Sequence, residues 1–481
     1  MADEQPTEKK ITIPQVPPVE TQHQITVANR LLSYTATTGI IPLKDEDKDE
    51  ITAGIFFTAY TLNDVADTAA RPLIFVFNGG PGSSSVWLHL GAIGPQRVKM
   101  QDEGWMPAPP FHLEDNPYTW LDLADLVFID PVGTGFSRAA DPEKKKDFWS
   151  VENDLKSVGD FIRLYLTRYK RWHSPLYLAG ESYGTTRAAG LAGYLFDRGI
   201  AFNGLLLIST VLNFQTISFD QGNDLPFMLF LPTYAATAWY HRLLTPDLQH
   251  KSLVDFLTEV EAWAETDYTV ALSKGDRLTA GGREAVIQKL ALYTGLEPRF
   301  LDYTNLRVRD QHFFKELLRS KKRTVGRLDS RFTGIDRLYV TETPEFDPSM
   351  TAILPPYTAM FNQYVRESLG YETDATYEIL SISVNQAWQW DRGKFPDTSE
   401  SLRSATSKNP FMKVFLALGY YDLATPHFAT EYTLSHMDLD PSVRSNIITA
   451  YYEAGHMLYL DITSLARLKS DVSQFMQGIE Q

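Results

Sequence analysis

Residues 178–190 read LAGESYGTTRAAG and place Ser182 between Gly180 and Gly184. The apolar run PLYLA before the serine has the length and β-rich character of a buried strand, and the small residues after it favour a helix packed closely on a sheet. In a G-x-S-x-G turn from strand to helix, the serine Oγ is lifted out of the backbone and the glycines remove side chains that would clash. The stretch therefore predicts a nucleophilic serine; the alternative is a glycine-tolerant turn with an incidental serine.

Strand-like and helix-like segments alternate on both sides of this turn. Between residues 120 and 213 the short apolar runs ADLVFID, SPLYLAG and GLLLIST are separated by segments with helical spacing, and the pattern resumes with KVFLALG and NIITAYYEA. This alternation is typical of βαβ units and a parallel sheet. Residues 214–405 lack the alternation and contain helical pieces instead.

The sequence thus predicts four segments. They are a disordered N-terminal segment (1–22), a first part of an α/β core (23–213), a mainly helical cap insertion (214–405) and a second part of the core (406–481).

Composition narrows the classes of partner and compartment. The 481-residue chain has a net charge of −15, which disfavours nucleic acid or an anionic membrane as partner, and it has no cysteine. No apolar run reaches the roughly 18 residues that a membrane-spanning helix needs. The first residues carry no signal peptide, so the compartment is either cytoplasmic or, if Met1 replaces a removed signal, periplasmic or secreted. Oligomeric state is not indicated.

A nucleophilic serine needs a histidine base that is oriented by a carboxylate. On a doubly wound sheet these partners follow in the order serine, acid, histidine, each after a strand. Asp422 follows KVFLALG and His456 follows NIITAYYEA, so both are predicted as triad partners of Ser182. Asp461 is the rival acid, but it is better explained as a helix N-cap. Other histidines fit packing or surface roles, or lie too close to Asp422 in sequence (His89, His241, His250, His312, His427, His436).

A glycine loop, FVFNGGPGSSS at residues 75–85, follows an earlier strand. Acyl transfer generates an oxyanion that backbone N–H groups must stabilise. In this fold the donors are the N–H after the nucleophile and one from such a loop, which predicts Tyr183 and Gly80. The alternatives are a plain glycine–proline turn or a phosphate cradle, and the latter lacks the Gly-Lys-Ser/Thr ending it requires.

The motifs NGGPGSSS, DPVGTGFS, GESYG and AGHM occur in that order, and together they resemble the signature set of the serine carboxypeptidases. The tract LPTYAATAWYHRLL and the lack of cysteine resemble the bacterial branch of that family. The resemblance implies an α/β-hydrolase fold with a helical cap, peptide substrates, release of a C-terminal amino acid, and no metal or cofactor. It also implies that Asn78, Glu181 and the Gly79 N–H bind the substrate carboxylate.

Two positions depart from the family pattern. The family usually has a second glutamate, paired with the equivalent of Glu181, where this chain has Ala92, and many members have a tryptophan where this chain has Val76. Without the second glutamate, Glu181 has no carboxyl partner of raised pKa, so we expect a weaker preference for acidic pH. The second change removes one donor from the implied carboxylate site. Two alternatives stay open: an acyltransferase or esterase with the same acyl-enzyme, and a non-catalytic binding protein on a hydrolase fold.

Overall fold

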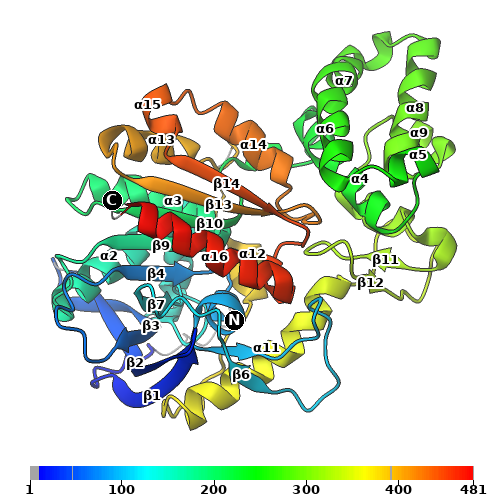
Figure 1. Cartoon of the computed structure of the whole chain (residues 1–481). Coiled ribbons are helices and arrows are strands. Elements are labelled where there is room, and N and C mark those ends of the chain that lie inside the picture. The colour runs from blue at the N-terminus through cyan, green and yellow to red at the C-terminus, as the bar shows by residue number, and fades with distance from the viewer. Residues whose placement is uncertain (1–9, 46, 391–392, 480–481) are drawn as a thin grey trace, which may run out of the picture.

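The computed structural model describes residues 10–45, 47–390 and 393–479, and a mixed β-sheet forms its centre (Figure 1). The strands lie in the spatial order β1 (Val19–Val27), β2 (Arg30–Asp45), β3 (Glu50–Leu62), β7 (Asp125–Ile129), β4 (Leu73–Phe77), β9 (Leu176–Ser182), β10 (Gly204–Thr210), β13 (Lys413–Gly419) and β14 (Ile447–Tyr452). Neighbours are antiparallel from β1 to β7 and parallel from β7 to β14. The parallel sheet predicted from the sequence is confirmed.

Helices cover both faces of the sheet, because successive residues of its inner strands point to opposite sides. On β4, Ile74 and Val76 belong to one apolar cluster, whereas Phe75 and Phe77 belong to the other. The first cluster is completed by α1 (Val86–Leu88), α11 (Pro348–Glu367) and α16 (Ile462–Ile479), the second by α2 (Val151–Arg168), α3 (Tyr183–Phe196) and α13 (Ser399–Lys408). The fold is therefore the α/β-hydrolase type that the sequence predicts.

A helical cap stands beside this three-layer core (Figure 1). Its helices share a third apolar cluster and are α4 (Leu225–Tyr240), α5 (Pro246–Gln249), α6 (Leu253–Trp263), α7 (Thr269–Lys274), α8 (Ala280–Thr294), α9 (Pro298–Tyr303) and α10 (Asp310–Glu316). Smaller elements connect the layers: β5 (Gln96–Val98), β6 (Leu113–Asp115), β8 (Arg138–Ala139), β11 (Thr324–Val325), β12 (Thr333–Gly334), α12 (Ile382–Ala387), α14 (His427–Ser435) and α15 (Pro441–Arg444).

The structure refines the predicted segments in two places. Strand β1 starts at Val19, so residues 19–22 of the segment predicted to be disordered (1–22) are part of the sheet. Residues 10–18 have no regular secondary structure, although Ile13 is buried, and residues 1–9 lie outside the described chain. Within 214–405, α11 and α13 pack on the sheet with the core helices, while α4–α10 form the separate cap. Among the helices of the described chain, none has both the length and the apolar character to cross a membrane.

Candidate active site

Ser182 sits at a sharp turn between β9 and α3. Its backbone has φ 61° and ψ −131°, a positive-φ conformation that residues other than glycine rarely adopt. A Cβ on Gly180 would lie 2.2 Å from the Gly184 carbonyl oxygen, and one on Gly184 would lie 2.8 Å from that of Phe77. Both glycines are therefore required sterically, which explains the G-x-S-x-G spacing.

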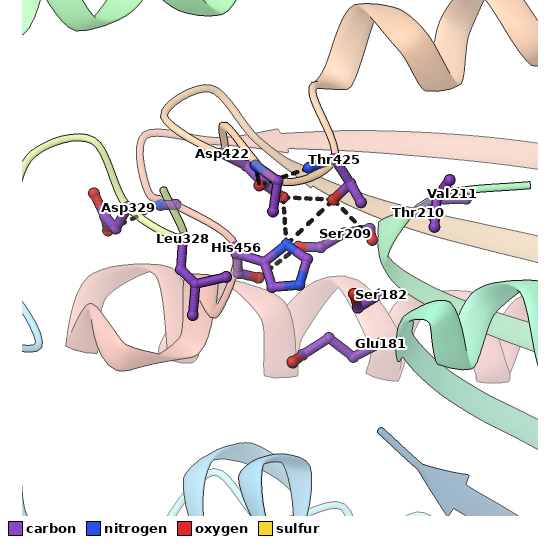
Figure 2. A network of polar contacts seen from close by, with 12 residues as sticks. Glu181, Ser182, Ser209, Thr210, Val211, Leu328, Asp329, Asp422, Thr425 and His456 are labelled. Carbon is purple, nitrogen blue, oxygen red and sulfur yellow. Dashed lines mark hydrogen bonds and ion pairs between the residues drawn. The ribbon is translucent and has the colours of Figure 1, made fainter. Parts of the chain in front are cut away.

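The predicted acid and base are in direct contact. His456 Nδ1 lies 2.7 Å from Asp422 Oδ2, and both side chains are buried (Figure 2). Asp422 Oδ1 accepts hydrogen bonds from the N–H groups of Ala424 and Thr425 at 2.8 and 2.9 Å, and Thr425 Oγ1 donates to Oδ2 at 2.7 Å. Burial lowers the pKa of His456, but the charge and hydrogen bond of Asp422 outweigh it and leave that pKa above its ordinary value. This pairing suits an imidazole that must accept a proton.

The serine lies on the other side of this imidazole. Figure 2 shows the second ring nitrogen of His456 on the side that faces Ser182. Both residues line one cavity of about 280 Å³, although no hydrogen bond joins their side chains among the contacts of the described chain. Without substrate, such contacts are often longer than in the reacting complex. The geometry is therefore compatible with proton transfer from Ser182 to His456.

A loop of the 214–405 segment, which we call the clamp loop (residues 326–332), contacts the loops that carry the predicted acid and base. The Leu328 carbonyl accepts the His456 N–H at 2.6 Å, and Asp329 Oδ2 accepts the Gly455 N–H at 3.1 Å. The Arg327 carbonyl accepts the N–H of Leu423 at 3.1 Å. Sequence reasoning missed this loop, because nothing in its composition signals contact with residues about 100 positions away.

The predicted oxyanion donors lie where the glycine loop meets the start of α3. A Cβ on Gly79 would lie only 2.4 Å from the Tyr183 nitrogen, so the two segments touch at backbone distance. Gly80 has φ +104°, which favours glycine at that position. Neither Gly80 N–H nor Tyr183 N–H has a hydrogen-bond partner among the described contacts. Both groups are thus free to bind a developing oxyanion.

The three residues implied in carboxylate binding line the same cavity. Asn78 Nδ2 donates to Glu181 Oε1 at 3.1 Å, and Asn78 Oδ1 accepts the Leu88 N–H at 3.0 Å, which fixes the orientation of the amide. Burial raises the pKa of Glu181 to about 7, an effect that the neighbouring positive charge of His456 and hydrogen bonding partly offset. Glu181 therefore exchanges its proton near neutral pH.

The Tyr459 ring packs against the glycine that precedes Ala92, the position where the family pattern has its second glutamate. A Cβ on Gly91, the neighbour of Ala92, would lie 2.5 Å from the Tyr459 ring and 2.7 Å from the Tyr357 hydroxyl. The Tyr459 hydroxyl lies next to Glu181 and Asn78. Neither that hydroxyl nor Glu181 Oε2 completes a hydrogen bond of ordinary geometry, although both are buried. Val76, the second departure, is buried in the core of β4.

The structure gives the competing residues other roles. Asp461 Oδ1 accepts the Ser464 N–H at 2.8 Å and so caps α16, as predicted. His89 is buried against Tyr60 and Phe128, which confirms the packing role expected from the sequence.

Comparison with known proteins identifies the family. The sequence profile of the family described as "Serine carboxypeptidase" matches residues 32–457. The chain belongs to the serine carboxypeptidase family. Serine carboxypeptidase-like 16 of Arabidopsis thaliana is 32% identical over 155 residues, which is 32% of this chain and 33% of that protein. The pheromone-processing carboxypeptidase KEX1 of Saccharomyces cerevisiae is 35% identical over 155 residues, 30% of this chain and 20% of that protein.

A solved carboxypeptidase structure has a similar fold. A prohormone-processing carboxypeptidase from Saccharomyces cerevisiae superposes with a TM-score of 0.57 at 19% identity, over 92% of this chain and 91% of the other. The aligned sequence regions span a third or less of the two curated relatives, which come from a plant and a yeast. What this family member acts on is therefore a matter for proposal.

Proposed function

We propose that this chain is a serine carboxypeptidase that removes a C-terminal amino acid from peptides through an acyl-enzyme on Ser182. The observation that carries the proposal is the joint placement, around one cavity, of Ser182, His456 and the pair Asn78–Glu181. The first two residues supply acyl transfer. The pair supplies a site for the free carboxylate that distinguishes the end of a peptide from its interior.

In the proposed mechanism, Ser182 Oγ attacks the carbonyl carbon of the last peptide bond while His456 Nε2 takes its proton. Asp422 holds the imidazole through Nδ1 and stabilises its positive charge. The N–H groups of Gly80 and Tyr183 stabilise the oxyanion, each worth about 10²–10³ in rate for enzymes of this type. The imidazolium then gives its proton to the leaving amine, and a water molecule activated by His456 releases the acyl group from the serine.

The carboxylate of the leaving amino acid binds Asn78, the Gly79 N–H and Glu181 in this proposal. The Asn78 amide already donates to Glu181 Oε1, so the proton of a neutral Glu181 belongs on Oε2. That oxygen and the Tyr459 hydroxyl are buried next to each other and neither completes a hydrogen bond of ordinary geometry, a costly state that a bound carboxylate would relieve. Two donors thus converge on one anionic group.

An acyltransferase or esterase is the second candidate, favoured by the lack of a glutamate at Ala92 and of a tryptophan at Val76. It shares the acyl-enzyme and differs in the group that accepts the acyl chain. Competition between water and an added amine or alcohol during turnover separates the two. The resemblance of LPTYAATAWYHRLL to the bacterial branch also stays a prediction.

Blocked dipeptides with a free C-terminal carboxylate are expected to be cleaved, and the same peptides as C-terminal amides are expected to be poor substrates. The carboxylate preference should fall as the pH rises through about 7, because the pKa of Glu181 lies there and its ionised form repels the substrate. For ester substrates without a carboxylate, kcat/KM should continue to rise with pH as His456 loses its proton. The measurement is the ratio of kcat/KM for peptide and ester between pH 5 and pH 9.

Glu181→Gln is the matched control for this profile. Its amide remains a donor at every pH, so the peptide-to-ester ratio should no longer depend on pH. A wild-type ratio that is flat across the range would contradict the role of Glu181, and equal cleavage of acids and amides would contradict the carboxypeptidase assignment.

Tyr459→Phe tests whether this hydroxyl replaces the missing glutamate. The change removes one donor to the substrate carboxylate, so kcat/KM for peptides should fall about tenfold, the scale of one hydrogen bond to a charged group. Since the hydroxyl also stabilises ionised Glu181, its loss should move the alkaline decline of peptide cleavage to higher pH. Hydrolysis of an ester without a carboxylate is the control, and it should be unchanged because the three triad residues remain in place. An unchanged peptide profile would assign Tyr459 to packing alone.

A further inference from the structure

A cluster of metal-ligating side chains lies outside the catalytic cavity, where the cap meets the core. His427 and Glu431 are four residues apart on α14, so both project from the same face of that helix. Glu261 comes from α6 of the cap, and its Oε1 lies 3.0 Å from His427 Nε2. One ligand atom from each of the three residues lies within 4.8 Å of the others. We propose that Glu261, His427 and Glu431 bind a first-row divalent cation, zinc foremost, that links the cap to the core.

The surroundings of His427 favour metal binding through its Nε2 atom. Its side chain is 1% exposed, and its other nitrogen, Nδ1, lies 3.5 Å from Thr233 Oγ1 on α4. An Nδ1–H donated to this hydroxyl would leave the Nε2 lone pair free, and such outer hydrogen bonds commonly orient histidine ligands. The Tyr451 hydroxyl makes a comparable contact with Glu431. Two of the three ligands thus have a supporting partner from another element.

The charges of this cluster are unbalanced. Glu265, one turn beyond Glu261, adds a third carboxylate near Glu431. Within the described chain, neither Glu265 nor Glu431 forms an ion pair with lysine or arginine, and the ion pair of Glu261 is with His427 alone. Arg444 lines the adjoining cavity of about 670 Å³ without reaching these carboxylates in an ion pair. A divalent cation would supply the missing positive charge.

The donor set favours a particular class of cation. One imidazole nitrogen with two carboxylates suits zinc, which takes nitrogen and oxygen ligands and leaves a position for water. Magnesium prefers oxygen ligands alone in octahedral geometry. The cavity beside Glu431 and Glu265 would give the cation an entry path from solvent.

The cation would join elements that bear on the catalytic site. Helix α14 begins five residues after Asp422, and its Phe428 and Ala429 belong to the apolar cluster of the cap. A metal bridge from α6 to α14 would therefore fix the cap against the helix that follows the acid of the triad. No step of peptide cleavage is assigned to it.

The test uses the full chain stripped with a chelator and titrated with zinc chloride by calorimetry and thermal unfolding. We expect one saturable site and a rise in Tm for wild type, with binding weakened at least about 100-fold in His427→Gln and in Glu431→Gln. Magnesium at the same concentration should leave Tm unchanged. Cobalt(II) bound in place of zinc should give visible absorption bands that both variants lose.

His436→Gln is the matched control, because His436 is an exposed imidazole on the same cavity but outside the three-ligand set. It should bind zinc like wild type. Absence of zinc binding by wild type, or equal binding by wild type, His427→Gln and Glu431→Gln, would overturn the proposal. The two variants change different helical positions, and unfolding without metal shows whether each still folds.

Discussion

Ser182→Ala is expected to remove peptide cleavage almost entirely, by roughly 10⁶-fold in kcat on the scale of serine hydrolases. Alanine fits the space of the serine but offers no oxygen to form the acyl-enzyme. The measurements are kcat with a peptide that has a free carboxylate, and labelling by a fluorophosphonate probe, which should disappear with the serine.

The control for this change is the thermal stability of the variant, which shows whether it still folds. Ser182 already adopts a φ of 61°, so alanine inherits the same backbone strain and should unfold at a similar temperature. A variant that keeps most of its activity would show that the nucleophile lies elsewhere. Loss of labelling with retained cleavage would point to a mechanism without an acyl-serine.

Asp422→Asn is expected to lower kcat by about 10⁴-fold, as the equivalent change does in triads generally. Oδ1 of Asp422 accepts two backbone N–H groups, and Oδ2 accepts the Thr425 hydroxyl and His456 Nδ1–H. An asparagine NH₂ cannot accept any of these bonds, so it would face a donor and favour the wrong tautomer of the imidazole. Steady-state kinetics with peptide and ester substrates should show the loss for both.

Asp461→Asn provides the matched comparison, since Asp461 was the rival acid and caps α16 in the structure. It should keep near-normal kcat and lose at most about 1 kcal/mol of stability, the scale of a helix cap. If Asp461→Asn lost activity as strongly as Asp422→Asn, the assignment of the triad acid would be wrong.

The parallel sheet and the strand-to-helix turn could be predicted from the sequence because local signals specify them. Short apolar runs between helical segments indicate the sheet. The glycines on either side of Ser182 are required sterically, because a Cβ on Gly180 or Gly184 would lie 2.2 or 2.8 Å from a backbone carbonyl oxygen. Asp422 and His456 could be placed after their strands because parallel strands end at one edge. The structure brings these three residues together, and their catalytic roles stay predictions.

The parts that could not be predicted depend on contacts between distant segments. Tyr459 lies next to Glu181, and its ring occupies the space that a side chain on Gly91 of another element would fill. The clamp loop and the ligand cluster of Glu261 join the 214–405 segment to the core, and that segment carries no periodic pattern that fixes its orientation. The boundary between cap and core could not be predicted for the same reason. The sequence places α11 and α13 in the cap insertion, but both helices pack on the sheet.

The clamp loop has a consequence for protein engineering. A Cβ on Gly455 would lie 2.5 Å from the Leu328 carbonyl oxygen. The backbone just before His456 is therefore packed tightly against the clamp loop, with no room for a side chain between them. Grafting the helical region of another hydrolase onto this scaffold would therefore have to carry residues 326–332 along unchanged. A transplant that replaced them would remove the groups that accept the N–H hydrogen bonds of Gly455 and His456, so the helical region of this molecule cannot be exchanged without changing the support of the predicted base.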